Sequence, residues 1–325
     1  MSFSSFNNWT VWGVGAAIGL FLLRRWIKGG QFTERVSAKG KIAVVTGGNA
    51  GIGKETVRGL NLAGAKVYML CRNEQRANEA IVALVKMGCD PSRLIFVKCD
   101  LTSFASVREC AKKLETAEDH IDILANNAGM MFHPKHELTE DGHEITWQSN
   151  YLGPFLLTEL LLPLVKKAEE GRIFNVSSMT HSSIGPLDLD KIDSAEMYTG
   201  YLPVYARTKL ANVMHAVELT RRLQRDRQNT VTINSLHPGA VTTEIARNFW
   251  MFKYTRFLQP VMSFFFKTER DGAQTSLYLA LSKKVKDVSG KYFSDCKVKE
   301  ESAIARDQLG CTQLYEYSMK TVGLA

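Results

Sequence analysis

One tyrosine and one lysine of this chain have the types and the spacing of a proton-transfer pair. Tyr205 and Lys209 stand in the stretch YARTK, and no other tyrosine is followed by a lysine four residues later. On a helix this spacing places both side chains on one face. A phenol titrates near pKa ~10, so proton transfer at neutral pH needs a shift of about three units, which a neighbouring ammonium favours. Such a pair is by itself more often an ordinary helix face, so further residues must support the interpretation.

A second cluster with chemical meaning is the glycine-rich stretch TGGNAGIG, residues 46–53. Gly47, Gly51 and Gly53 follow an apolar run directly and precede a helical pattern. Glycine lets the chain turn tightly there and lets a pyrophosphate approach the backbone, whose free N–H groups at the helix start favour an anion. An ordinary glycine-rich turn is the alternative, but the position after the first strand favours a dinucleotide site.

The end of the second apolar run bears on which dinucleotide is bound. NAD-binding folds usually place an acid there for the ribose hydroxyls. This chain has Leu70, Cys71 and Arg72 instead. Because a guanidinium can meet a 2′-phosphate with several donors, the sequence predicts NADP(H) rather than NAD(H).

The elements that must position these residues alternate between strand and helix. Short β-branched runs predict strands at 41–46, 65–70, 93–99, 121–127, 172–178, 230–236 and near 290–293. Helical patterns lie between them at 52–63, 74–87, 103–116, about 140–168, 203–226 and 270–281. The alternation predicts an α/β fold, a doubly wound Rossmann-type parallel sheet of about seven strands.

The N-terminus differs from the rest of the chain. Residues 9–23 read WTVWGVGAAIGLFLL and contain no charge, and basic residues follow from Arg24 onward. A cleavable signal peptide would carry its charge before the apolar run, so we expect an uncleaved membrane anchor helix. The positive-inside rule then places the remaining chain in the cytosol. We therefore divide the chain into an anchor with a basic linker, 1–38, and a catalytic domain, 39–325.

The length of the apolar run leaves two alternatives open. Fifteen residues span roughly 22 Å, less than a ~30 Å hydrocarbon core, so a half-inserted helix is the main alternative to a full span. Gly15 and Gly19 form a G-x-x-x-G, a spacing that can bring two membrane helices together. Chance is the better explanation of that spacing, and a homodimer is the weaker expectation.

The bulk composition restricts the partners. The net charge is +8, which favours anionic partners, but no nucleic-acid-binding module is recognisable, so a surface facing anionic lipid is the simpler interpretation. Six scattered cysteines without a C-x-x-C pair indicate reduced thiols in a cytosol-facing compartment. We expect no bound metal, because the carboxylates form no ligand-like cluster.

In combination the motifs resemble the short-chain dehydrogenase/reductase family over residues 39–325. They are TGGNAGIG (46–53), CDL (99–101), NNAG (126–129), Asn150, NVSS (175–178), YARTK (205–209) and HPGAVTT (237–243). More narrowly, the chain resembles the membrane-anchored retinol dehydrogenases. The closer resemblance lies in the N-terminal anchor, FLLTELLL (155–162), RTKLAN (207–212), the stretch 264–281 and GKYFSDC (290–296).

The resemblance implies a role for each matching residue. Tyr205 would exchange a proton with the substrate oxygen, and Lys209 would lower its pKa and hold the nicotinamide ribose. Ser178, rather than Ser177, would hydrogen-bond the substrate oxygen as hydride moves, and Asn150 would hold a proton-relaying water. The expected cofactor-binding residues are Thr46, Gly47, Asn49, Gly51, Ile52, Gly53, Arg72, Asp100, Leu101, Asn127, Ala128, Gly129, Tyr205, Lys209, Pro238, Gly239, Val241 and Thr243.

Three features depart from the resemblance or extend it. The related enzymes read roughly N-H-L-G-H after the active-site asparagine, whereas this chain continues to Pro154. A proline bends a helix, so it could shift Asn150 or reshape the substrate wall. The aromatic-rich stretch 245–266 is an apolar lid or a core-packing helix pair, with equal support. His181 is expected at the surface rather than facing the substrate.

The expected activity is that of a membrane-anchored NADP(H)-dependent oxidoreductase acting on a small lipophilic alcohol or carbonyl, with retinol and retinal first. A steroid or a lipid-derived aldehyde is the alternative substrate. A catalytically silent dinucleotide-binding scaffold is the alternative of another class, and an intact Ser178, Tyr205 and Lys209 argues against it. The expected location is the endoplasmic reticulum membrane, with the catalytic domain in the cytosol.

Overall fold

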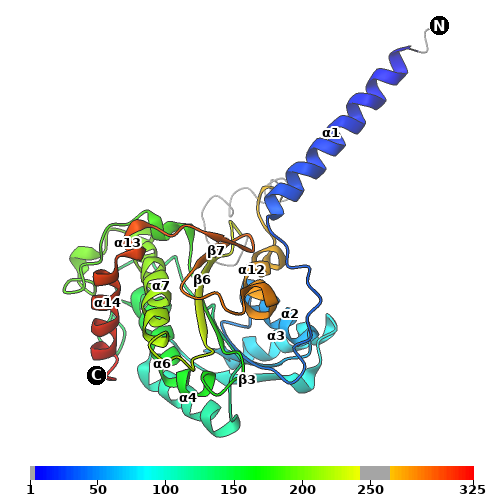
Figure 1. The fold of residues 1–325 in the computed structure, drawn as a ribbon. Coiled ribbons are helices and arrows are strands. Elements are labelled where there is room, and N and C mark those ends of the chain that lie inside the picture. The colour runs from blue at the N-terminus through cyan, green and yellow to red at the C-terminus, as the bar shows by residue number, and fades with distance from the viewer. Residues whose placement is uncertain (1–3, 242–263) are drawn as a thin grey trace.

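The computed structural model describes residues 4–241 and 264–325 (Figure 1). One sheet runs through the body, with strands β1 (Ile42–Thr46), β2 (Lys66–Cys71), β3 (Leu94–Lys98), β4 (Ile123–Asn126), β5 (Arg172–Val176), β6 (Thr232–His237), β7 (Tyr292–Ser294) and β8 (Lys297–Lys299). The α-helices are α1 (Ser4–Lys28), α2 (Gly51–Leu62), α3 (Glu74–Lys86), α4 (Phe104–Ala117), α5 (Ile145–Trp147), α6 (Gly153–Val165), α7 (Tyr201–Leu223), α11 (Glu269–Gly272), α12 (Gln274–Leu281), α13 (Ala303–Arg306) and α14 (Gln308–Thr321).

The strand order confirms the doubly wound fold. The sheet runs β3-β2-β1-β4-β5-β6-β7-β8, and every pair up to β6–β7 is parallel. Because β1 pairs with β2 on one side and β4 on the other, the connections diverge at β1. A crevice forms at such a switch point, outside the carboxyl ends of the strands.

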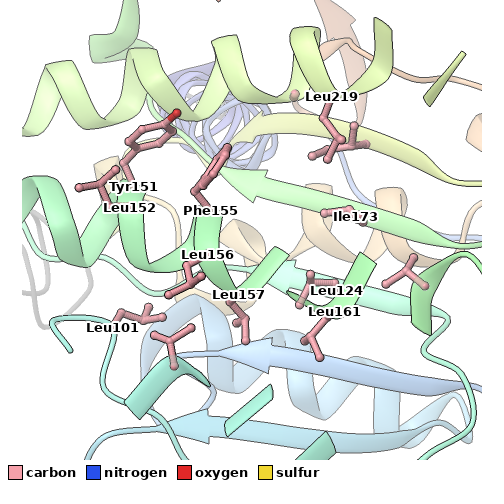
Figure 2. Packing of buried hydrophobic residues seen from close by; sticks show 14 of the residues in the cluster. Leu101, Leu124, Tyr151, Leu152, Phe155, Leu156, Leu157, Leu161, Ile173 and Leu219 are labelled. Atoms are coloured by element: carbon pink, nitrogen blue, oxygen red, sulfur yellow. The ribbon is translucent and has the colours of Figure 1, made fainter. Parts of the chain in front are cut away.

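The strands are buried on both faces, which explains their continuous apolar runs. Ile42 and Val44 of β1 belong to one core, whereas Ala43 and Val45 belong to the other. The first core packs α4, α6, α7 and α14 on the sheet, and the second packs α2, α3 and α12 on the opposite face. Figure 2 shows Leu157 and Leu161 of α6 in the first core, close to Leu124 of β4. This three-layer arrangement is what holds the strand ends rigidly.

The expected number of strands was wrong, because an eighth strand forms the edge of the sheet. β8 pairs antiparallel with β7 across a tight turn at Asp295 and Cys296, whose φ angles are 54° and 57°. Turns with two positive φ angles usually contain Asn-Gly or Asp-Gly, so the Asp-Cys pair carries no such signal. β8 is also short, charged and exposed, reading Lys-Val-Lys, which is typical of a protected edge strand.

The long helix expected over 140–168 is broken into three pieces. Between α5 and α6 the chain forms a π-helical turn, η2 (Gln148–Leu152), and Pro154 stands in the first turn of α6. Residue 154 would be the α-helical donor to the carbonyl of Asn150, and proline has no N–H to donate. The Asn212 side chain donates to that carbonyl instead, at 3.1 Å. α13 and α14, near the C-terminus, were not expected at all.

The N-terminal helix α1 projects away from the body in Figure 1. Its last turns attach to the segment that follows β6, since Arg24 donates to the carbonyls of Phe264 and Phe266 at 2.8 and 2.7 Å. Arg24 also lies 3.9 Å from the carboxylate of Asp271. In the described part of the chain, no helix combines the length and the apolar character needed to cross a bilayer. The aromatic-rich stretch 245–266 lies outside the described residues except for 264–266.

All six cysteines are free thiols, and all but Cys296 are buried. Burial of the Cys71 thiol raises its pKa to about 11, so this thiol stays protonated at neutral pH.

Candidate active site

A cavity of about 700 Å³ opens at the carboxyl ends of the central strands. Its walls contain sixteen of the eighteen expected cofactor-binding residues, namely Gly47, Asn49, Gly51, Ile52, Gly53, Arg72, Asp100, Leu101, Asn127, Ala128, Gly129, Tyr205, Lys209, Pro238, Gly239 and Val241. Thr46 lies beneath the wall, and Thr243 lies outside the described residues. Residues from six separate stretches of chain therefore meet beyond the carboxyl ends of β1 and β4.

The glycine turn after β1 has the geometry of an anion cradle. Gly47 and Gly51 have positive φ angles of 66° and 56°, which disfavour any side chain. A Cβ on Gly53 would lie 2.2 Å from the Gly47 carbonyl oxygen and 2.4 Å from Nδ2 of Asn127. The turn therefore packs against the chain after β4, and the start of α2 faces the cavity with free N–H groups.

Thr46 is a structural tie rather than a cavity residue. Its hydroxyl accepts hydrogen bonds from the backbone N–H groups of Asn127 and Ala128, both at 2.9 Å. The Asn127 side chain donates to the Thr46 carbonyl at 2.8 Å. Two adjacent strand ends are thereby joined, which fixes the floor of the cavity.

The far end of the cavity carries two arginines. Arg72 follows β2, and Arg76 lies one helical turn later in α3, beyond the helix-capping Asn73. Both arginine side chains are exposed to solvent at the cavity rim. Arg76 was not among the expected residues, although its spacing of four from Arg72 was visible in the sequence. The carboxylate of Asp100 accepts from the N–H and hydroxyl of Thr102 at 3.0 and 2.7 Å, which orients the opposite wall.

The expected catalytic residues converge at the other end. Tyr205 and Lys209 lie on α7, and the ammonium nitrogen of Lys209 stands 5.2 Å from the centroid of the Tyr205 ring. Lys209 donates to the carbonyl of Val176 at 2.8 Å, which anchors it at the end of β5. Ser178 hydrogen-bonds the Tyr205 side chain. The Ser177 hydroxyl instead donates to the Lys209 carbonyl at 2.6 Å, although Ser177 lines the cavity. The expected role of Ser178, to hydrogen-bond the substrate oxygen, stays a prediction.

Burial governs the protonation of this pair. It raises the pKa of Tyr205 to about 12, against a smaller lowering effect of the Ser178 hydrogen bond. It lowers the pKa of Lys209 to about 8. The expected lowering of the tyrosine pKa is therefore wrong for the protein alone, because removal from water disfavours the phenolate more than neighbouring groups favour it. At neutral pH the phenol keeps its proton and is an acid.

Asn150 is buried, and its amide is engaged by the backbone of Met130 and by the Thr208 hydroxyl, to which it donates at 3.2 Å. It accepts from the Met130 N–H at 2.8 Å and donates to the Met130 carbonyl at 2.7 Å. Lys209 and Asn150 face each other across Gly129, where an added Cβ would lie 3.3 Å from Nζ and 3.5 Å from Oδ1. Pro154 has thus not removed Asn150 from the site. The expected role of Asn150, to hold a relaying water, stays a prediction.

The fold and this constellation define a nicotinamide-dependent oxidoreductase scaffold, and the chain belongs to the short-chain dehydrogenase family. The family model for short chain dehydrogenases matches residues 41–188. Human retinol dehydrogenase 11 is 38% identical over 302 residues, covering 93% of this chain and 92% of that protein. Mouse retinol dehydrogenase 14 is 39% identical over 295 residues, covering 88% and 86%.

Solved structures agree with the fold. A protein of Mycobacterium paratuberculosis aligns with a TM-score of 0.71 at 25% identity, covering 90% of this chain and 98% of that one. A short chain dehydrogenase of Burkholderia cenocepacia in complex with NADP aligns with a TM-score of 0.61 at 21% identity, covering 80% and 97%. The chain is thus an oxidoreductase of this family, similar to retinol dehydrogenases.

Proposed function

We propose that the protein is a membrane-associated NADP(H)-dependent oxidoreductase that interconverts a lipophilic alcohol and its carbonyl, with retinol and retinal as the first pair to test. The observation that carries the proposal is the arrangement along the cavity. Tyr205 and Lys209 line one end, with Ser178 hydrogen-bonded to Tyr205, and Arg72 and Arg76 line the other. The similarity to retinol dehydrogenases supports the choice of substrate.

The residues of the cavity fit a nicotinamide dinucleotide. The glycine cradle, which a single Cβ at Gly53 would fill, suits a pyrophosphate. When bound, the cofactor supplies or accepts hydride at its nicotinamide ring. Lys209 would hold the adjoining ribose, and Arg72 and Arg76 would hold a 2′-phosphate.

The chain's own residues handle the proton. In carbonyl reduction, Ser178 donates a hydrogen bond to the substrate oxygen and Tyr205 transfers its phenolic proton to that oxygen. The buried Lys209, held by Val176, stabilises the phenolate that remains. In the oxidative direction the same proton returns to Tyr205.

The function is tested with purified full-length protein, NADPH or NADH, and a panel of retinal, steroid ketones and alkanals. Retinal turnover with NADPH is the expected result. Turnover of a steroid ketone or an alkanal alone would transfer the assignment to the alternative substrates. No turnover of any member, with intact NADPH binding, would favour the silent scaffold and overturn the proposal.

Arg72→Ala should raise the KM for NADPH about tenfold or more and leave the KM for NADH within twofold, since a charge-assisted hydrogen bond contributes roughly 1.5–3 kcal/mol. Lys98→Ala is the matched control. Lys98 is exposed at the end of neighbouring β3 but does not line the cavity. Equal effects of Arg72→Ala on both cofactors would refute the phosphate contact.

We further propose that α1 attaches the protein to a membrane, either by spanning it or by insertion into one leaflet. Large apolar side chains are exposed all round the helix, among them Trp12, Phe21 and Trp26 at 77%, 65% and 79%. A helix that is apolar on every side needs a nonpolar environment. The basic residues after the helix favour a cytosolic catalytic domain, with the endoplasmic reticulum as the membrane. Pairing of two α1 helices through Gly15 and Gly19 is the secondary proposal.

Replacing Trp12 and Phe21 together by glutamate should move the protein from the membrane fraction into the supernatant of carbonate-washed microsomes. Leu309→Glu, at a side chain exposed to 67% on α14, should leave it with the membrane. Protease added to intact microsomes should digest the catalytic domain. Retention of the double variant would contradict attachment through α1, and full protection would contradict the orientation.

A further inference from the structure

His181 is buried, contrary to its expected place at the surface. Only 3% of the residue is exposed. It lies in the short 3₁₀ helix η3 (Met179–Ser182), whose N-cap is Ser178. Its ring packs against Tyr292 of β7, with ring centroids 4.5 Å apart. Because buried polar groups are normally hydrogen-bonded, both ring nitrogens of this imidazole should have partners.

Both ring nitrogens have partners whose own roles are fixed. Nδ1 lies 2.8 Å from the carbonyl oxygen of Ser178, and Nε2 lies 3.2 Å from the backbone nitrogen of Ser302. A carbonyl can only accept and a backbone N–H can only donate. The ring must therefore be neutral, with its proton on Nδ1. Burial also lowers the pKa of His181, in agreement with the neutral form.

The two contacts join the reactive end of the cavity to the C-terminal segment. The Ser178 carbonyl receives a second donor, the His181 backbone N–H at 3.1 Å. The Ser178 hydroxyl accepts from the Thr180 N–H at 3.2 Å and meets Tyr205. Because Ser178 follows the end of β5, its carbonyl is not hydrogen-bonded to a neighbouring strand. The ring and the backbone N–H of His181 donate to this carbonyl instead.

We propose that His181 is a positioning residue that holds Ser178 against Tyr205 and is itself kept in one tautomer by the backbone of Ser302. The role rests on the proposed function, because it assumes that Ser178 meets the substrate oxygen. A shift of about 1 Å in a reacting group can cost 10²-fold in rate, so the effect should appear in kcat.

Ser302 offers a test outside the catalytic machinery. Its backbone angles, φ −61° and ψ 151°, are those of a proline, so Ser302→Pro removes the N–H with little strain. Ser302→Ala is the matched control, because both variants lose the serine cap on the Ala305 N–H and only the proline loses the contact to His181. We expect Ser302→Pro to lower kcat about tenfold relative to Ser302→Ala, with the Kd for NADPH unchanged.

Replacing His181 by asparagine or glutamine distinguishes a role in positioning Ser178 from a role in filling the space that the imidazole occupies. His181→Asn keeps a donor near the Nδ1 place, and His181→Gln keeps an acceptor near the Nε2 place. If His181 positions Ser178, His181→Asn should have a higher kcat than His181→Gln, while the two variants unfold at similar thermal midpoints. Equal kcat for Ser302→Pro and Ser302→Ala, or kcat that follows the thermal midpoint alone in all four variants, would overturn the proposal.

A spectroscopic readout distinguishes this failure from failure of the proposed function. The ¹⁵N spectrum of the full-length protein labelled at its seven histidines should contain one neutral Nδ1-protonated ring that disappears in His181→Asn. That signal should shift in Ser302→Pro and stay in Ser302→Ala. An Nε2-protonated His181 would refute the geometry whether or not the protein turns over any substrate.

Discussion

Tyr205→Phe is expected to lower kcat for carbonyl reduction by about 10³-fold, while the Kd for NADPH stays within twofold. General acid catalysis contributes about 10²–10⁴-fold to such steps, and the variant removes the proton that this mechanism transfers to the substrate oxygen. The pKa of about 12 makes the wild-type phenol a proton donor throughout the neutral range. Single-turnover reduction with NADPH measures the effect on the chemical step itself.

Tyr201→Phe is the control for this experiment. Tyr201 begins α7, one turn before Tyr205, and its ring packs against Phe132 with centroids 4.9 Å apart. The Tyr201→Phe variant also loses a phenolic hydroxyl, but one that takes no part in the proposed proton transfer. Its kcat should therefore stay close to that of the wild type. A Tyr205→Phe variant with wild-type turnover would refute the assignment of the acid.

Gly53→Ala is expected to weaken NADPH binding by about 10- to 100-fold, as overpacking typically costs 1–3 kcal/mol. The added Cβ would lie 2.2 Å from the Gly47 carbonyl oxygen. That atom belongs to the backbone of the cradle, so the turn must move away from the start of α2. Isothermal titration with NADPH measures the change directly.

The matched control is Gly185→Ala, because a Cβ there would meet nothing within 4 Å and the backbone needs no positive φ. Its Kd for NADPH should equal that of the wild type. If Gly53→Ala also binds normally, the glycine turn is not the pyrophosphate site, and the cofactor must lie elsewhere in the cavity.

Much of the fold could be predicted because it depends on local patterns. β1 is confirmed almost residue for residue, since an uninterrupted β-branched run must be buried on both faces of a parallel sheet. The elements that the sequence missed depend on distant contacts. α14 carries a weak pattern of its own and is held by Tyr315, whose ring packs against Phe155 of α6 at 5.2 Å. η2 depends on Pro154 and on Asn212 of α7 together.

The sequence by itself determined the chemical inventory of the site and its order along the chain. Tyr205 and Lys209 share a helix face because they are four residues apart, and the glycines after β1 must turn because of their type. The tertiary structure alone decided which groups are free to react. The Ser177 hydroxyl is hydrogen-bonded to the Lys209 carbonyl, and His181 is buried against Ser178. Burial raises the pKa of Tyr205, whereas Lys209 was expected to lower it. The physical reason is that hydrogen-bond partners and exclusion of water come from segments distant in sequence, and no local spacing encodes them.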